Sequence, residues 1–215
     1  MATTFINGRR LLVMPGLPLA PATIEYKANP ITAATTAVFT GGQQVYDWQQ
    51  GFMEWSLSMP PISEEDWPAW SAFLKSCRGV TGVFQFGDPR RQSPRGSVAG
   101  APVVNGIGQT GYSLSTSGWT ANSAGVLLPG DYIQLGYRLH ECIDTVDADS
   151  LGHATFEIWP PLRESPSGGE GSPPVFEPVI TSNTKGLWCM KSNSPSWSID
   201  DNRNYHLTFE LREAI

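Results

Sequence analysis

The stretch SEEDWPAWSAFLKSCRGVTGVFQFGDP, residues Ser63–Pro89, decides the fold because it holds the one segment with clear helical periodicity. Apolar side chains recur in it at positions i, i+3, i+6, i+7 and i+10, a spacing that places them on one face of an α-helix. These residues are Trp67, Trp70, Phe73, Leu74 and Cys77. We expect them to form the buried face of a helix.

Both ends of this segment carry helix-terminating signals. Ser63, with Asp66 three residues later, resembles a capping box in which Asp replaces the usual Glu or Gln. Gly79 predicts the C-terminal stop, because glycine readily adopts the left-handed cap conformation. Pro68 conflicts with an N-cap at Ser63, since it would fall just past the first turn. The helix therefore either begins nearer Asp66 or has an irregular first turn.

Two strands are expected to share a domain with this helix. After the glycine stop, Phe84 and Phe86 predict a short strand, which Gly87-Asp88-Pro89 closes. Near the end of the chain, the apolar residues alternate with polar ones, as in a strand with one buried face. These residues are Tyr205, Leu207, Phe209 and Leu211. A terminal strand with such an apolar face is expected to pair into a sheet.

The segment that precedes the helix predicts further strands, separated by glycines. Thr23–Lys27 and Thr36–Thr40 each have the composition of a short strand, and Gly41-Gly42 predicts a turn after the second. Gly51 is expected to break the next strand. A half-buried strand then follows at Phe52–Met59, where mostly alternate positions are apolar.

Residues 92–169 have the features of a separate small β domain. The first part, 92–126, is rich in Gly, Ser, Thr and Asn and has few charges. Farther along, Gly130 and Asp131 lie in a turn that precedes a strand, and Trp159 ends an alternating strand. Short strands at this spacing, joined by glycine turns, predict a small barrel or sandwich.

The chain is therefore expected to be mainly β and discontinuous in its domains. Residues 23–91 and 170–215 would together form a sheet domain with one flanking α-helix, and residues 92–169 would be inserted in it. The segment SPSGGEGSPP, Ser165–Pro174, is the most linker-like in the chain. Residues 1–22, which contain three prolines after Met14, predict an extended N-terminal arm.

Composition supports a folded β protein and disfavours two classes of function. A hydrophobic content of 40% allows a real core, and 22 Gly with 18 Pro suit many tight turns. The net charge of −6 argues against stable binding of nucleic acid, since phosphate contacts need clustered Lys and Arg. No run approaches the roughly 18 apolar residues of a membrane span, so membrane insertion is not expected.

Residues that carry chemistry are present but are not spaced as catalytic or metal sites. The three histidines, His140, His153 and His206, have no metal-ligand spacing. The acids between Asp144 and Asp149 lack the Gly and Glu of a calcium loop, and the glycine-rich run Gly106–Gly111 lacks the Lys of a phosphate loop. The three cysteines form no CxxC pair. We expect no enzyme activity, no metal and no cofactor.

Two groups of residues leave a binding role open. The basic cluster Arg90, Arg91 and Arg95 is short and broken by proline, which favours a solvated loop over a phosphate site. Aromatic residues are candidates for stacking on sugars, although a core or subunit-interface role is favoured for them. These residues are Trp119, Tyr132, Trp159, Trp188 and Trp197.

Several long strings of this sequence resemble a group of minor tail proteins of long-tailed bacteriophages and prophages. The strings lie between Gln43 and the C-terminus. They are WPAWSAFLKSCRGVTGVFQFGDPRRQSPRG, GQTGYSLSTSGW, LLPGDYIQLGYRLHECIDTVDAD, FEIWPPLRESP and WSIDDNRNYHLTFELREA. The group is similar to the distal tail protein, which forms a ring at the tip of the tail. Residues 1–22 carry none of this resemblance.

The resemblance implies a structural role without catalytic residues or cofactors. The first domain would be a tail-tube-like β-sandwich or split barrel that the last strand closes, and the second β domain would face outward. Six copies would form a ring that joins the tail tube protein to the hub or fibre proteins. The protein would be assembled in the cytoplasm of the bacterial host and would reside at the virion tail tip.

Two other classes of function are weighed against this expectation. A carbohydrate-binding module would use the inserted domain to contact the host surface, and would need Trp119 or Tyr132 to line an open groove. An enzyme, such as a cell-wall hydrolase, would need convergent acid and base groups in a cleft. The sequence shows no such constellation, so the structural role is preferred.

Overall fold

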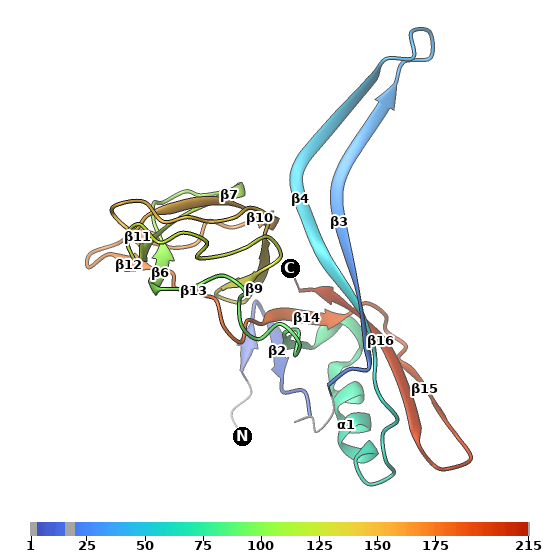
Figure 1. Ribbon diagram of the computed structural model, residues 1–215. Coiled ribbons are helices and arrows are strands. Elements are labelled where there is room, and N and C mark those ends of the chain that lie inside the picture. The colour runs from blue at the N-terminus through green and yellow to red at the C-terminus, as the bar shows by residue number, and fades with distance from the viewer. Residues whose placement is uncertain (1–3, 16–19, 215) are drawn as a thin grey trace. The chain divides into compact units, whose positions relative to one another are not determined.

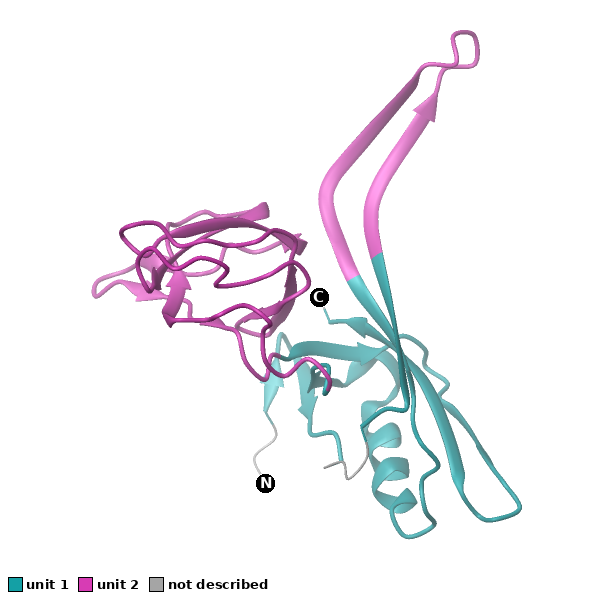
Figure 2. Ribbon diagram, viewed as in Figure 1, with its two compact units in different colours: residues 1–28, 53–89, 185–215 teal, residues 29–52, 90–184 magenta. Residues whose placement is uncertain are grey.

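The computed structural model describes residues 4–15 and 20–214 and shows a mainly β protein with one α-helix among them (Figure 1). The predicted fold class, mainly β with a single helix, is confirmed. The chain divides into two compact units (Figure 2). Unit 1 comprises 1–28, 53–89 and 185–215, and unit 2 comprises 29–52 and 90–184.

The predicted domain boundaries differ from these units at two places. Residues 29–52 group with unit 2 and not with the helix-bearing domain. The chain returns to unit 1 at Lys185 and not at 170. The reason is that two further strands, β12 (Val175–Phe176) and β13 (Val179–Ile180), pair with strands of unit 2. The predicted linker Ser165–Pro174 also contains a strand, β11 (Gly168–Glu170), which pairs with β12.

The described part of the predicted N-terminal arm belongs to the sheet of unit 1. β1 (Phe5–Ile6) and β2 (Arg9–Leu12) pair antiparallel, and β2 runs parallel to β5 (Val83–Phe86). The prediction of a separate extended arm over 1–22 is wrong for these residues, because their backbone groups enter the β ladder. Residues 1–3 and 16–19 of that predicted arm lie outside the described part.

The last strand of the chain holds the sheet of unit 1 together. β16 (Tyr205–Glu213) pairs antiparallel with β14 (Gly186–Met190), with β4 (Gln43–Ser58) and with β15 (Ser196–Ile199). The order of the sheet is β1-β2-β5-β14-β16-β4-β3, where β3 spans Thr23–Thr36. The predicted alternation is present, since Leu207, Phe209 and Leu211 are buried while the residues between them are exposed.

Helix α1 (Trp67–Cys77) begins next to Asp66, which is one of the two predicted alternatives, and its C-cap is Arg78 and not Gly79. Its N-cap is Asp66, so Pro68 lies in the first turn, where a missing N–H removes no helical hydrogen bond. Ser63 lies in the preceding turn, where its Oγ accepts a hydrogen bond from the N–H of Asp66 at 3.2 Å. At the other end, Arg78 adopts the left-handed conformation, with φ of 48°, before the 3-10 turn η1 (Gly79–Thr81).

The buried face of α1 packs on the aromatic core of unit 1. All five residues that the helical spacing places on one face are buried. Phe73 meets Phe84 edge to face, with ring centroids 5.1 Å apart. The next layer of the core joins the strands. The ring centroid of Trp55 in β4 lies 4.4 Å from that of Trp188 in β14 and 5.8 Å from that of Phe86 in β5.

The main sheet of unit 2 is a nearly closed, barrel-like sheet of six strands in the order β13-β8-β9-β10-β7-β6. The five long strands are β6 (Gly100–Val104), β7 (Gly111–Trp119), β8 (Tyr132–Leu135), β9 (Arg138–Cys142) and β10 (Ala154–Leu162). The two ends of the sheet approach each other, because Val103 bridges Pro178 and the N–H of Val104 donates to Glu177 O at 2.8 Å.

The interior of this barrel is apolar and well filled. Leu114, Leu127, Ile133 and Ile158 are fully buried there. β10 continues to Leu162, so the predicted end of this strand at Trp159 is wrong, and Pro160 and Pro161 lie within the strand. Its register with β7 shifts between Glu157 and Leu162, and the prolines fall in that shift, where no ladder hydrogen bond is required of them.

Candidate functional site

The outer half of the β3–β4 hairpin is the first candidate surface, whereas the inner half pairs with β16 and contributes Trp55 to the core of unit 1. The strands of the hairpin have 14 and 16 residues, and the tip lies between Ala37 and Gly42. The predicted strand at Thr36–Thr40 is wrong, because the tip occupies it. Gly51 does not break the chain, and β4 runs through it.

The outer half of this hairpin, residues 29–50, is a two-stranded ribbon (Figure 1) whose residues are exposed or partly exposed, and Tyr112 of β7 donates its hydroxyl to Asp47 in it at 3.2 Å. Every residue from Gln43 to Gln50 is exposed. The tip residues Val38 and Phe39 are 92% and 100% exposed, and Trp48 is 59% exposed. A two-stranded hairpin is at best marginally stable in water, so large apolar residues on it point to a covering partner.

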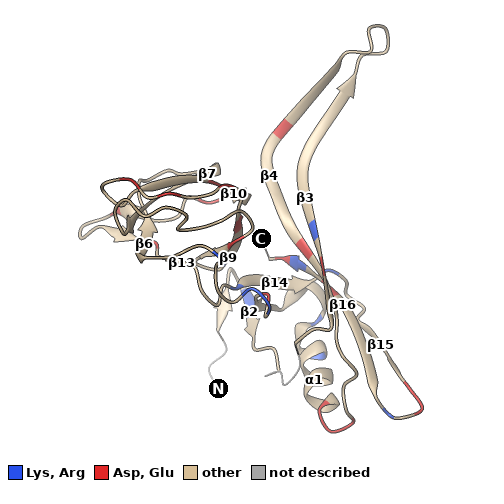
Figure 3. Ribbon diagram, viewed as in Figure 1, with Lys and Arg blue, Asp and Glu red and all other residues tan. Residues whose placement is uncertain are grey.

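The charge pattern of the hairpin agrees with burial in a partner. Residues 28–46 contain no Lys, Arg, Asp or Glu, and Figure 3 shows the distal part of both strands in the colour of uncharged residues. Exposed strand edges usually carry charges, prolines or bulges that block pairing with another chain. Pro30 is the one such residue between 28 and 46. The periodicity of the sequence does not reveal this surface. Apolar and polar residues alternate in the same way whether a strand is covered by its own chain or by another molecule.

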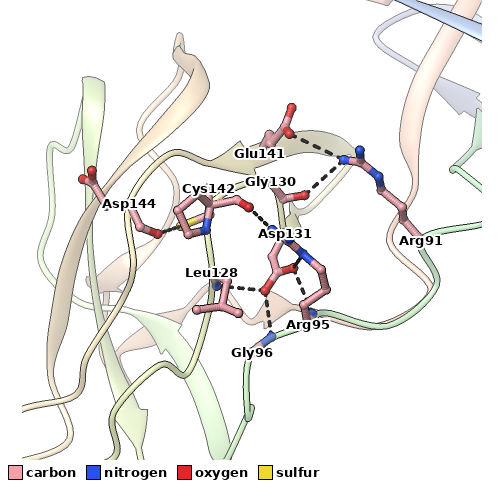
Figure 4. A network of polar contacts seen from close by, with 10 residues as sticks. Arg91, Arg95, Gly96, Leu128, Gly130, Asp131, Glu141, Cys142 and Asp144 are labelled. Atoms are coloured by element: carbon pink, nitrogen blue, oxygen red, sulfur yellow. Dashed lines mark hydrogen bonds and ion pairs between the residues drawn. The ribbon is translucent and has the colours of Figure 1, made fainter.

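A second candidate lies in unit 2, where the arginine loop (residues 90–95) meets the turn at Pro129–Asp131 (Figure 4). Gly130 has φ of +90°, which favours glycine and confirms the predicted turn. The carboxylate of Asp131 is buried and accepts hydrogen bonds from the backbone N–H groups of Arg95, Gly96 and Leu128 at 2.9–3.0 Å. Burial alone would raise the pKa of Asp131, but these donors outweigh it and hold the pKa below its ordinary value.

The arginines of this loop are anchored in defined positions. The guanidinium of Arg91 donates to Gly130 O at 3.2 Å, pairs with Glu141 at 3.5 Å and lies 5.3 Å from the ring centre of Tyr132. Arg95 donates to Pro129 O and pairs with Asp131. Burial raises the pKa of Glu141, while Arg91 and Arg95 act in the opposite direction. These contacts fix the loop that was predicted to be solvated, and the side chains of Arg91 and Arg95 remain 49% and 64% exposed.

These side chains line a pocket of about 420 Å³. Its walls include Arg90, Arg91, Arg95, Ser93, Tyr132 and Thr181. The arginines are close together in the sequence, whereas Thr181 lies far along the chain and joins them only in the folded structure.

The histidines and acidic residues that were weighed as catalytic or metal-binding candidates make hydrogen bonds within the fold. His140 is buried with its Nδ1 2.7 Å from Pro160 O, and burial lowers its pKa to about 4. Asp149 accepts the backbone N–H groups of Leu151 and His153 in its own turn at 2.8 Å, and Asp147 accepts that of Gly125 at 2.7 Å. Among the residues that the structure describes, no group of three or more His, Cys, Asp or Glu is placed to hold a metal ion.

The candidate aromatic residues are mostly core residues. Trp119 is buried and donates its Nε1–H to Thr116 Oγ1 at 2.8 Å, and Trp188 donates to Phe86 O at 2.8 Å. Trp159 is half-buried and stacks on Tyr112 with centroids 6.3 Å apart. Trp197 is 39% exposed and contacts Trp67. Neither Trp119 nor the buried Tyr132 presents an open stacking face for a sugar.

Comparison with known proteins adds no assignment. No protein-family model matches the chain, and no curated protein matches it significantly. None of the helices within 4–15 and 20–214 is long and apolar enough to cross a membrane.

Proposed function

We propose that this chain is a structural subunit of a ring at the tip of a bacteriophage tail. Six copies would join the tail tube protein to the hub or fibre proteins, and assembly would take place in the cytoplasm of the bacterial host. The proposal rests on the resemblance of the sequence strings to minor tail proteins. The structural observation that supports it best is the exposed outer half of the β3–β4 hairpin, which carries no charged residue from 28 to 46.

The hairpin supplies a physical reason for self-association. Burying one large apolar side chain is worth about 1.5–3 kcal/mol, and the outer half of the hairpin exposes several such residues. These are Val38, Phe39, Val45, Tyr46 and Trp48. A hairpin of one copy that packs on a different surface of the next copy makes a heterologous contact. Contacts of that kind generate closed rings when the rotation between copies closes.

The sheet of unit 1 offers further contacts of the same kind. Its order places β1 at one end and β3 at the other. Strands at the ends of a sheet present backbone groups that pair readily with another chain. Pairing across subunits would satisfy those groups and would remove the tendency of open edges to aggregate.

The proposed role is non-enzymatic and needs no cofactor. His140 is buried beside a backbone carbonyl, and Asp131 accepts the N–H groups that shape its own loop. These contacts explain the two residues by folding alone. The alternative role as a carbohydrate-binding module through stacked aromatic rings is disfavoured by the burial of Trp119.

Imaging of the purified full chain tests the proposal. Negative-stain microscopy and light scattering are expected to show closed rings of six copies, alone or after addition of tail tube protein. A chain that stays monomeric in both preparations, and that is missing from purified virions, would contradict the proposed function.

A further inference from the structure

We propose that the pocket beside the arginine loop binds an anionic sugar, with the guanidinium groups holding its phosphate or carboxylate. This proposal goes beyond the ring-forming role and does not depend on it. The pocket lies wholly within unit 2.

The first argument is the convergence of three cations from a stretch of six residues. Arg90, Arg91 and Arg95 all line the same pocket. A guanidinium presents planar N–H donors in a fork that matches an oxyanion. In a chain with a net charge of −6, three arginines on one pocket form a local reversal of charge.

The second argument is the fixed position of two of these groups. Arg91 is held by Gly130 O and by the Tyr132 ring, and Arg95 is held by Asp131. The side chains of Arg91 and Arg95 nevertheless remain 49% and 64% exposed. Binding an anion there costs little ordering of long side chains, which is a main cost of recognition by arginine.

The third argument is the charge that remains after the internal pairs. The side chain of Asp131 is 2% exposed and accepts hydrogen bonds from the backbone of its own loop, so its charge is directed inward. Glu141 is 32% exposed and pairs with Arg91. Arg91 and Arg95 each have a carboxylate partner, so the pocket and its immediate surroundings hold three arginines against two carboxylates.

The size and walls of the pocket favour a sugar that carries the anion. A volume of about 420 Å³ lies within the range of small-molecule sites and exceeds the space that a bare oxyanion needs. Ser93, Thr181 and Tyr132, which each carry a hydroxyl group, are among the residues that line it. Hydroxyls donate and accept hydrogen bonds, which suits the hydroxyl groups of a sugar.

Titration calorimetry of the full-length chain at fixed ionic strength tests this assignment. The probes are glucose 1-phosphate, glucuronate, inorganic phosphate and glucose. We expect saturable binding of glucose 1-phosphate or glucuronate, binding of inorganic phosphate weaker by about fivefold or more, and none of glucose. The stronger of the two anionic sugars identifies the source of the negative charge. Equal binding of phosphate and both sugars would overturn the sugar assignment, and no saturable binding of any anion would overturn the site.

Two variants place the binding in this pocket. Arg91→Gln is expected to weaken the anionic sugar by about tenfold, whereas Arg203→Gln, an exposed arginine of unit 1, should leave binding unchanged. Arg91 also contacts the turn, so thermal melting checks that the Arg91→Gln protein is folded. If Arg91→Gln melts at a lower temperature than wild type, the test uses Arg90→Gln in its place. Unchanged affinity in a folded arginine variant of the pocket would contradict the proposal.

Discussion

Phe73 of α1 meets Phe84 of β5 edge to face, with ring centroids 5.1 Å apart and the planes at 76°. Both rings are buried. This contact fixes the helix on the sheet of unit 1 and joins the two ends of the stretch Ser63–Pro89. The pair is the most direct test of the packing of unit 1.

Phe73→Ala is expected to lower the free energy of unfolding by about 3–5 kcal/mol, because it removes a buried ring and leaves a cavity. Urea denaturation followed by tryptophan fluorescence measures the change. Phe73→Asp should prevent unit 1 from folding, since a buried unpaired charge is costlier still. Ala72→Asp puts the same charge on the exposed face of α1 and serves as the control. Equal denaturation midpoints for Phe73→Asp and the control would refute the packing.

Asp131→Asn is expected to destabilise unit 2 by about 2–3 kcal/mol, because a charged acceptor of several N–H groups is lost. The pKa of Asp131 is lowered in the folded state, so its contribution is present above the ordinary carboxyl pKa of 3.8 and is lost as the pH falls further. The difference between wild type and variant should shrink below pH 3.8. A difference that stays constant from neutral to acidic pH would argue against a charged role.

Burial of His140 is expected to make the free energy of unfolding depend on pH in a second, less acidic range. Its pKa falls from 6.5 to about 4 on folding, because burial disfavours the imidazolium. The unfolded chain therefore takes up a proton first, and about 3 kcal/mol of stability is lost as the pH falls from 6.5 to about 4. His140→Gln should remove this slope in urea titrations, whatever its absolute stability. The exposed His153, replaced by Gln, provides the control, and an unchanged slope in His140→Gln would be the contrary result.

The hairpin variants Phe39→Asp and Trp48→Asp are expected to fold as wild type but to fail to assemble, because the residues are exposed in one copy. Circular dichroism and light scattering separate the two effects. Ile107→Asp, an apolar-to-acid change at a residue 69% exposed in unit 2, should assemble normally. Rings formed by both hairpin variants would show that the hairpin is not the contact.

The helix face and the last strand could be predicted from the sequence because their periodicity reports a face buried within the same chain. Trp67 and Trp70 recur at helical spacing, and Leu207 and Phe209 alternate, whatever their exact neighbours. The helix start was ambiguous, since Ser63 and Asp66 both carry a capping signal. Tertiary structure placed the cap at Asp66, where Pro68 is tolerated.

Other features depend on partners that sequence order does not reveal. The prolines after Trp159 are compatible with β10 only because its register shifts there. The arginine loop was expected to be solvated, and its order comes from Asp131 and Gly130, far along the chain. The hairpin gave no sequence signal beyond its lack of charge, because exposure of its outer half appears only when the other elements are placed.

Labelling of a single engineered thiol tests the central claim that the outer half of the hairpin is buried between copies. Cys77, Cys142 and Cys189 are all buried, and burial raises the pKa of the first two thiols to about 11, so they should react slowly with maleimide. In Phe39→Cys, the new thiol should react rapidly in the monomer and be protected by about tenfold or more in the assembled ring. Ile107→Cys should react equally in both. Equal labelling of Phe39→Cys in monomer and ring would contradict the account.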